Sequence, residues 1–238
     1  HLDKNSAVGV SYCPSLFVDD DGVCLGIRQK PKLSHIGMED IFCRNPIGNG
    51  SAPVIRKTVF DDIAFLGISH GRLRTWYFDE TFKQSEDIEC WLRIAAKTQW
   101  QFEGINPPLT YYRVNEQGLS ANVVNQFNNW KRACQNMAAI APEAYTTWGK
   151  LAEAYQLRYL ARRAIRSRNP ELALKLVVLA IETNYKILVK EPKRTVNTLL
   201  CAGLINLLPA RMFNGLECLA MNAVRLIGSE KCTKAYRQ

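Results

Sequence analysis

Two adjacent carboxylates, Glu86 and Asp87, are the residues whose type and place best suit acid–base chemistry. Ser85 before them and apolar residues at helical spacing after them predict a helix over 86–98 that begins at this pair. The helix dipole favours an ionised carboxylate there, while a neighbouring carboxylate raises one pKa. The pair could therefore cap the helix, or Asp87 could take a proton from a hydroxyl group that Glu86 helps to bind. The residues alone favour the cap.

The remaining pattern divides into a mixed front part and a helical back part. Residues 8–27 predict a hairpin around the turn Asp19-Asp20-Asp21-Gly22, in which turn formation explains the aspartates better than a metal does. We expect a short helix over 35–43, a strand from 54 leading into a short helix, and strands over 100–105 and 109–114. Helices are predicted over 123–140, 143–168, 171–189, 193–208 and 210–227. The segments on either side of Asn169-Pro170 predict an αα-hairpin in a small bundle.

The stretch WYFDETFKQSEDIECWLRI, residues 76–94, resembles the acceptor-side motif of family 2 glycosyltransferases, which have the GT-A fold. That motif reads Gly-x-Phe-Asp-Glu, a short loop, Glu-Asp and then a helix with Leu-x-x-Arg. Three further segments resemble the family in the expected order: VGVSYCPSLFVDDDGVCLG, GNGSAPVIRKTVF and PPLTYYRVNEQGLSAN. Together they cover residues 8–122.

The resemblance implies an inverting transfer of a sugar from a nucleotide-sugar donor to a glycan or lipid-linked acceptor, with Asp87 as the base. It implies a bracing role for Asp79 and Glu80, and loop or phosphate contacts for Tyr112 and Arg113. The glycine-rich loop 48–51 is flexible enough to approach a sugar closely, although an ordinary surface turn explains it equally well. The acceptor-binding residues that follow from this hypothesis are Glu86, Asn49, Gly50, Ser51 and Trp91.

The sequence departs from the family pattern in two places. The Asp-x-Asp motif that holds Mg²⁺ or Mn²⁺ on the donor, and the nucleotide-binding βαβ units, should precede residue 8 and do not occur there. We therefore expect this chain to begin inside a longer protein, to need a divalent metal only in the full-length enzyme, and to be inactive alone. Asn115 stands where many members carry His, and an amide oxygen suits Mg²⁺ better than a transition metal. It is a weak candidate for a metal ligand.

Composition places the chain among globular proteins and concentrates its charge at one end. Its 238 residues are 47% hydrophobic and 22% charged, which excludes a disordered or collagenous chain. Residues 1–150 are neutral overall, so the net charge of +9 lies in residues 151–238. We expect either a bundle with solvated arginines or a surface that docks on an anionic membrane. No nucleic-acid recognition motif occurs. The eight cysteines have no zinc spacing, which favours buried thiols in a reducing cytoplasm.

The sequence thus predicts an α/β part of a GT-A-like domain, with a mixed sheet, over 1–122, followed by an all-α extension over 123–238. The function expected is glycosyl transfer in polysaccharide or cell-envelope synthesis, in the cytoplasm or peripherally at the inner face of the membrane. The alternative is a non-catalytic α+β and helical module that binds a protein partner.

Overall fold

A computed structural model describes residues 1–114, 123–209, 211–213, 215 and 219. The strands are β1 (Val8–Tyr12), β2 (Ser15–Val18), β3 (Cys24–Arg28), β4 (Val54–Ile55), β5 (Phe65–Ser69), β6 (Arg72–Trp76), β7 (Gln101–Gly104) and β8 (Thr110–Arg113). A short 3₁₀ turn, Leu2–Lys4, precedes them. The helices are α1 (Met38–Arg44), α2 (Lys57–Ile63), α3 (Glu86–Lys97), α4 (Val123–Ile140), α5 (Pro142–Arg166), α6 (Pro170–Thr183), α7 (Lys186–Lys190) and α8 (Pro192–Leu207). The prediction of a mixed α/β part followed by helices is confirmed.

Two small mixed sheets run end to end through the front part. In one sheet β1 pairs with β4 antiparallel and with β7 parallel, and in the other β2 pairs with β3 antiparallel and with β8 parallel. The chain passes from β1 to β2 through Cys13-Pro14 and from β7 to β8 through a segment with two prolines. Because proline cannot donate a ladder hydrogen bond, the paired strands break and bend at this level. The predicted hairpin is confirmed for β2 and β3, whereas β1 belongs to the other sheet.

Prolines and asparagines set the ends of the helices in the back part. Pro142, Pro170 and Pro192 each open a helix, where their missing N–H costs nothing. The amide oxygen of Asn169 accepts a hydrogen bond from the Leu172 N–H, which caps α6. The single helix predicted over 171–189 is wrong: Asn184 ends α6 in an extended conformation, and its side-chain oxygen accepts from the Lys186 N–H at the start of α7.

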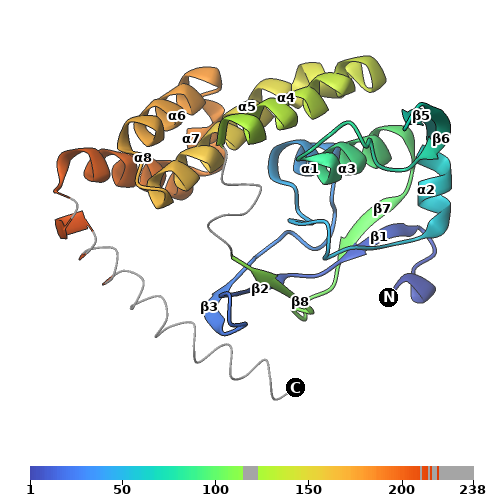
Figure 1. Cartoon of the computed structure of the whole chain (residues 1–238), viewed down its shortest axis with the longest axis horizontal. Helices are drawn as coiled ribbons and strands as arrows, with labels where there is room; N and C mark the ends of the chain where they lie inside the picture. Colours follow the sequence, from blue (N-terminus) through green and yellow to red (C-terminus); the bar gives the residue numbers. More distant parts are fainter. Residues whose placement is uncertain (115–122, 210, 214, 216–218, 220–238) are drawn as a thin grey trace.

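The main core is shared between the front part and the first helices of the back part. Figure 1 shows α1 and α3 lying between the strands and the row of helices α4 to α8, and α4 packs on α3 while α5 packs on α1. Residues from both sides of position 122 fill this core, among them Val10, Phe42, Trp91, Trp130, Met137 and Leu151. A second, smaller core lies between the end of α5, α6 and α8. The back part therefore packs against the front part and shares a hydrophobic core with it.

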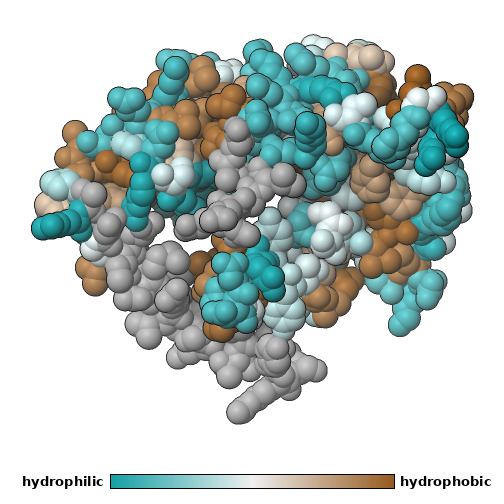
Figure 2. All heavy atoms as spheres, in the orientation of Figure 1, coloured by the Kyte–Doolittle hydropathy of each residue, from teal (hydrophilic) through white to brown (hydrophobic). Residues whose placement is uncertain are grey.

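A β-hairpin that the sequence reading did not predict follows α2. His70 and Gly71 both have positive φ, 51° and 72°, and form the two-residue turn between β5 and β6. One face of the hairpin carries Leu66, Ile68 and Leu73, which are each about two thirds exposed. Figure 2 shows apolar side chains gathered at this end of the molecule.

Among the described residues, no helix combines the length and the apolar character needed to cross a membrane. The six described cysteines form no disulfide; Cys13, Cys43, Cys90 and Cys134 are buried and Cys24 and Cys201 are exposed. The prediction of buried thiols holds for four of these six.

Candidate active site at the start of α3

The carboxylates singled out in the sequence lie in the first turn of α3, as predicted. Ser85 is the residue before the helix, but its side chain makes no capping hydrogen bond, and its φ of 64° lies in the left-handed region. That conformation costs a non-glycine residue energy and turns the chain sharply into α3. Glu86 is exposed and Asp87 is half-buried. The two neighbours therefore meet different surroundings although they are adjacent in sequence.

The pKa of Asp87 is raised to about 6, mainly by burial and to a smaller extent by the charge of Glu86. The Ile88 N–H, 2.7 Å from Asp87 Oδ1, acts in the opposite direction because it stabilises the ionised form. A carboxyl group with a pKa near neutrality suits proton transfer, because it is ionised at pH 7 and still basic enough to accept a proton. A carboxylate that only capped the helix would not need this burial.

The same pKa predicts how stability depends on pH. Folded Asp87 keeps its proton up to about pH 6, whereas the unfolded chain releases it near 3.8, so the free energy of unfolding falls as pH rises through this window. The change Asp87→Asn removes the cost of burying the charge, and we expect it to stabilise the protein by about 1–3 kcal/mol at neutral pH. This gain should disappear below about pH 4. Urea unfolding at the two pH values measures it, with the exposed-carboxylate variant Asp20→Asn as control. An equal gain at both pH values would contradict the assignment.

The loop that connects α1 to β4 lies beside Asp87. A Cβ placed on Gly50 would come within 3.9 Å of the Asp87 Cβ, with no backbone strain. The neighbouring Asn49 fixes the loop: its Nδ2 donates to the buried Ser15 Oγ at 2.9 Å, and its Oδ1 accepts from the Ser51 N–H at 3.0 Å. The structure thus brings the predicted loop to the predicted base. It also shows that the Asn49 amide braces the loop, while Gly50 and Ser51 are exposed.

A tight turn before α3 is held from two sides. Asp79 Oδ1 accepts from the Thr81 N–H at 2.9 Å and from the Thr81 hydroxyl at 2.5 Å. From α4, Arg132 donates to the Thr81 carbonyl, stacks on the Phe82 ring and lies 3.8 Å from Asp79 Oδ2. The bracing role that the resemblance implies for Asp79 agrees with these contacts. Nothing in the sequence near Arg132 indicated this contact, because it joins residues 51 positions apart.

Behind the site, a buried arginine connects three elements. Arg93 on α3 donates to both carboxylate oxygens of Glu89, each at 2.9 Å, and both side chains are nearly inaccessible. It also donates to the carbonyls of Ile63, at the end of α2, and Tyr77, just after β6. The arginine of the motif therefore fixes the elements that orient α3.

The other predicted site residues differ in burial. Trp91 is 1% exposed, and its ring packs in the core edge-to-face with Phe78. That placement favours packing over direct stacking on a sugar. Tyr112 and Arg113 are exposed on β8, where Tyr112 contacts Phe17. Asn115 lies outside the described residues.

No group of three or more His, Cys, Asp or Glu side chains in the described part of the chain could hold a metal ion. The three aspartates after β2 form a turn instead, because Asp19 Oδ1 accepts from the Asp21 and Val23 N–H groups at 3.1 and 2.8 Å. The prediction of a turn at this position is confirmed.

Comparisons with protein-family models, with curated proteins and with solved structures find no match. Evidence on function therefore comes from the residues and the geometry alone.

Proposed function

We propose that this chain is the acceptor-side part of an inverting glycosyltransferase with similarity to family 2. The observation that carries the proposal is the half-buried Asp87, with a pKa near 6, at the start of α3 and beside the exposed loop at Gly50. A base of this kind is what the attack of a hydroxyl group on a sugar requires. The order of motifs in the sequence supports the same reaction.

In the proposed reaction Asp87 takes the proton from an acceptor hydroxyl as that oxygen forms a bond to C1 of the donor sugar. The bond from C1 to the nucleoside diphosphate breaks on the opposite face, which inverts the configuration at C1. Glu86 is exposed and suits hydrogen bonding to other acceptor hydroxyls. Gly50 leaves room beside Asp87, because it has no side chain and a Cβ at this position would lie 3.9 Å from the Asp87 Cβ.

The donor and its metal belong to a part of the family pattern that precedes residue 8. Among the described residues, no group of three or more His, Cys, Asp or Glu side chains could hold this metal ion. No step of the proposed reaction is therefore assigned to a metal on this chain. A divalent cation bound upstream would neutralise the diphosphate as it leaves. We further propose a place at the cytoplasmic face of the membrane, supported by the exposed Arg162 and Arg166 of α5 and by the acceptor class that the resemblance implies.

Transfer from a panel of nucleotide sugars, with Mg²⁺ or Mn²⁺ and the full-length protein, tests the function. Within that assay, we expect Gly50→Leu to lower transfer about tenfold or more, because its side chain extends over Asp87. The matched variant Gly50→Ala should stay near the wild type, since its Cβ makes only an ordinary contact with Asp87. Equal activity of the two variants would contradict the placement of the acceptor. A protein inert toward every donor would favour the non-catalytic module.

A further inference from the structure

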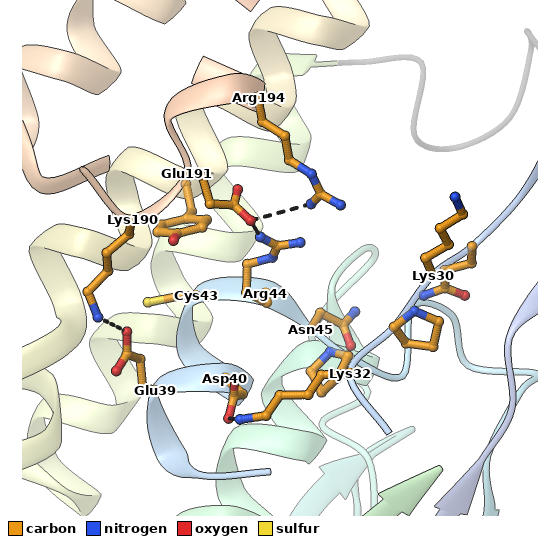
Figure 3. Close-up of a pocket in the computed structure, with 14 residues that line it drawn as sticks. Lys30, Lys32, Glu39, Asp40, Cys43, Arg44, Asn45, Lys190, Glu191 and Arg194 are labelled. Atoms are coloured by element: carbon orange, nitrogen blue, oxygen red, sulfur yellow. Dashed lines mark hydrogen bonds and ion pairs between the residues drawn. The ribbon is translucent and has the colours of Figure 1, made fainter. Parts of the chain in front are cut away.

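A charged cavity of about 680 Å³ lies between the front part and the back helices. Its walls are formed by the segment after β3, by α1, by Tyr155 of α5 and by the junction of α7 and α8 (Figure 3). Its size is that of a pocket for a small organic molecule. It opens on the far end of the loop that reaches Asp87, because Asn45 and Pro46 line it.

The basic side chains of this cavity outnumber the acidic ones. Two carboxylates each have a lysine: Asp40 lies 2.8 Å from Lys32 Nζ, and Glu39 pairs with Lys190. The remaining carboxylate, Glu191, receives three guanidinium groups: those of Arg44 and Arg158, and that of Arg194 at 3.5 Å (Figure 3 shows the first and the last). Counted over the described residues, this cluster keeps an excess of two positive charges.

One further cation lines the cavity across from this cluster. Lys30 has no ion pair among the residues that the structure describes, and its ammonium group stands on the opposite wall from Arg194 in Figure 3. The arginines differ in exposure: Arg158 is buried and also donates to Thr195 Oγ1 at 2.9 Å, whereas the side chain of Arg194 is 49% exposed. Arg158 thus supports the structure around Glu191 from inside the protein. Arg44, Arg194 and Lys30 line the cavity and are exposed, so a ligand can reach them.

The pKa values of Arg158 and Arg44 reflect the same excess of positive charge. The pKa of Arg158 is lowered to about 10, mainly by burial and also by repulsion from Arg44. Burial and the charge of Arg194 likewise lower the pKa of Arg44. A bound anion would relieve this repulsion and so stabilise the folded protein.

We propose that this cavity binds a phosphate-bearing small molecule, a mono- or diphosphate ester, through Arg44, Arg194 and Lys30. Guanidinium groups match the oxygens of a phosphate in bidentate geometry, and three cations suit a group with two or more negative charges. The ring of Tyr155, beneath Arg44 at 5.6 Å, and the prolines of the wall leave apolar surface for the organic part of the ester. The proposal stands independently of glycosyl transfer.

The test is calorimetric titration of the full chain with inorganic pyrophosphate at constant ionic strength. We expect binding, and we expect the double variant Lys30→Gln/Arg194→Gln to weaken it tenfold or more, because each lost hydrogen bond to a charged group weakens binding by about tenfold. Both residues are exposed, so the variant should fold, which its thermal unfolding checks. Lys193→Gln is the matched control, because Lys193 lies next to Arg194 on α8 but does not line the cavity. The variant removes one positive charge, as each change in the double variant does. It should change the affinity less than twofold.

Sedimentation with vesicles separates a free ester from a lipid headgroup. Binding of pyrophosphate that the double variant loses supports a soluble ester. Sedimentation with phosphatidylcholine vesicles only when they contain phosphatidic acid, again lost in the double variant, supports a headgroup with the same phosphate chemistry. The proposal is overturned if neither ligand binds, or if Lys193→Gln weakens binding as much as the double variant does.

Discussion

If Asp87 is the base of the proposed glycosyl transfer, the change Asp87→Asn should lower turnover by roughly a hundred- to ten-thousand-fold, the usual contribution of a general base. Asparagine has the shape of aspartate but cannot accept the proton of the attacking hydroxyl. The Michaelis constants for donor and acceptor should change little, because the loss concerns the transition state and not the binding of the substrates. Initial rates at saturating substrate measure the effect.

Two features of Asp87 make this result decisive. The same variant should be more stable than the wild type at neutral pH, so a loss of turnover cannot be assigned to unfolding. In the wild type, turnover should rise as pH passes through about 6, where the carboxyl group becomes ionised. The neighbouring change Glu86→Gln is the control, because it should act mainly on the Michaelis constant for the acceptor. A normal rate of sugar transfer by the Asp87→Asn variant would refute the proposed role of Asp87 as the base.

The start of α3 could be predicted because its signal is local. Ser85, Glu86 and Asp87 precede a run with helical spacing, and the structure starts a helix there. The left-handed backbone of Ser85 and the burial that separates Asp87 from Glu86 could not be predicted, because both depend on surrounding elements. The approach of Gly50 to Asp87 likewise depends on the bond from Asn49 to Ser15, which joins residues 34 positions apart.

The hairpin of β5 and β6 had a local signal that was missed. His70-Gly71 is a two-residue turn of the kind that requires positive φ, between segments with alternating apolar residues. The charged cavity had no such signal, because Arg44 and Glu191 meet only when the back helices pack on α1. The net charge of residues 151–238 indicated a cationic region, but not the elements that would enclose part of it.

The largest effect on stability is expected at Arg93. The change Arg93→Leu leaves the buried Glu89 carboxylate without its counter-charge and removes the donors to the carbonyls of Ile63 and Tyr77. Breaking a buried ion pair on one side costs about 3–5 kcal/mol, a large share of the stability of a typical domain. The exposed pair of Lys57 with Asp61 has the same helical spacing, so Lys57→Leu is the matched control, and we expect it to cost far less than Arg93→Leu because water screens the pair.

The double variant Glu89→Leu/Arg93→Leu separates the charge from the hydrogen bonds. It removes both charges, so it should recover part of the stability that Arg93→Leu loses. It cannot restore the bonds to the Ile63 and Tyr77 carbonyls, so it should remain less stable than the wild type. Urea unfolding followed by tryptophan fluorescence measures all three variants, since Trp76 and Trp91 lie on the elements that Arg93 connects. If Arg93→Leu costs no more than Lys57→Leu, this arginine does not hold α2, β6 and α3 together.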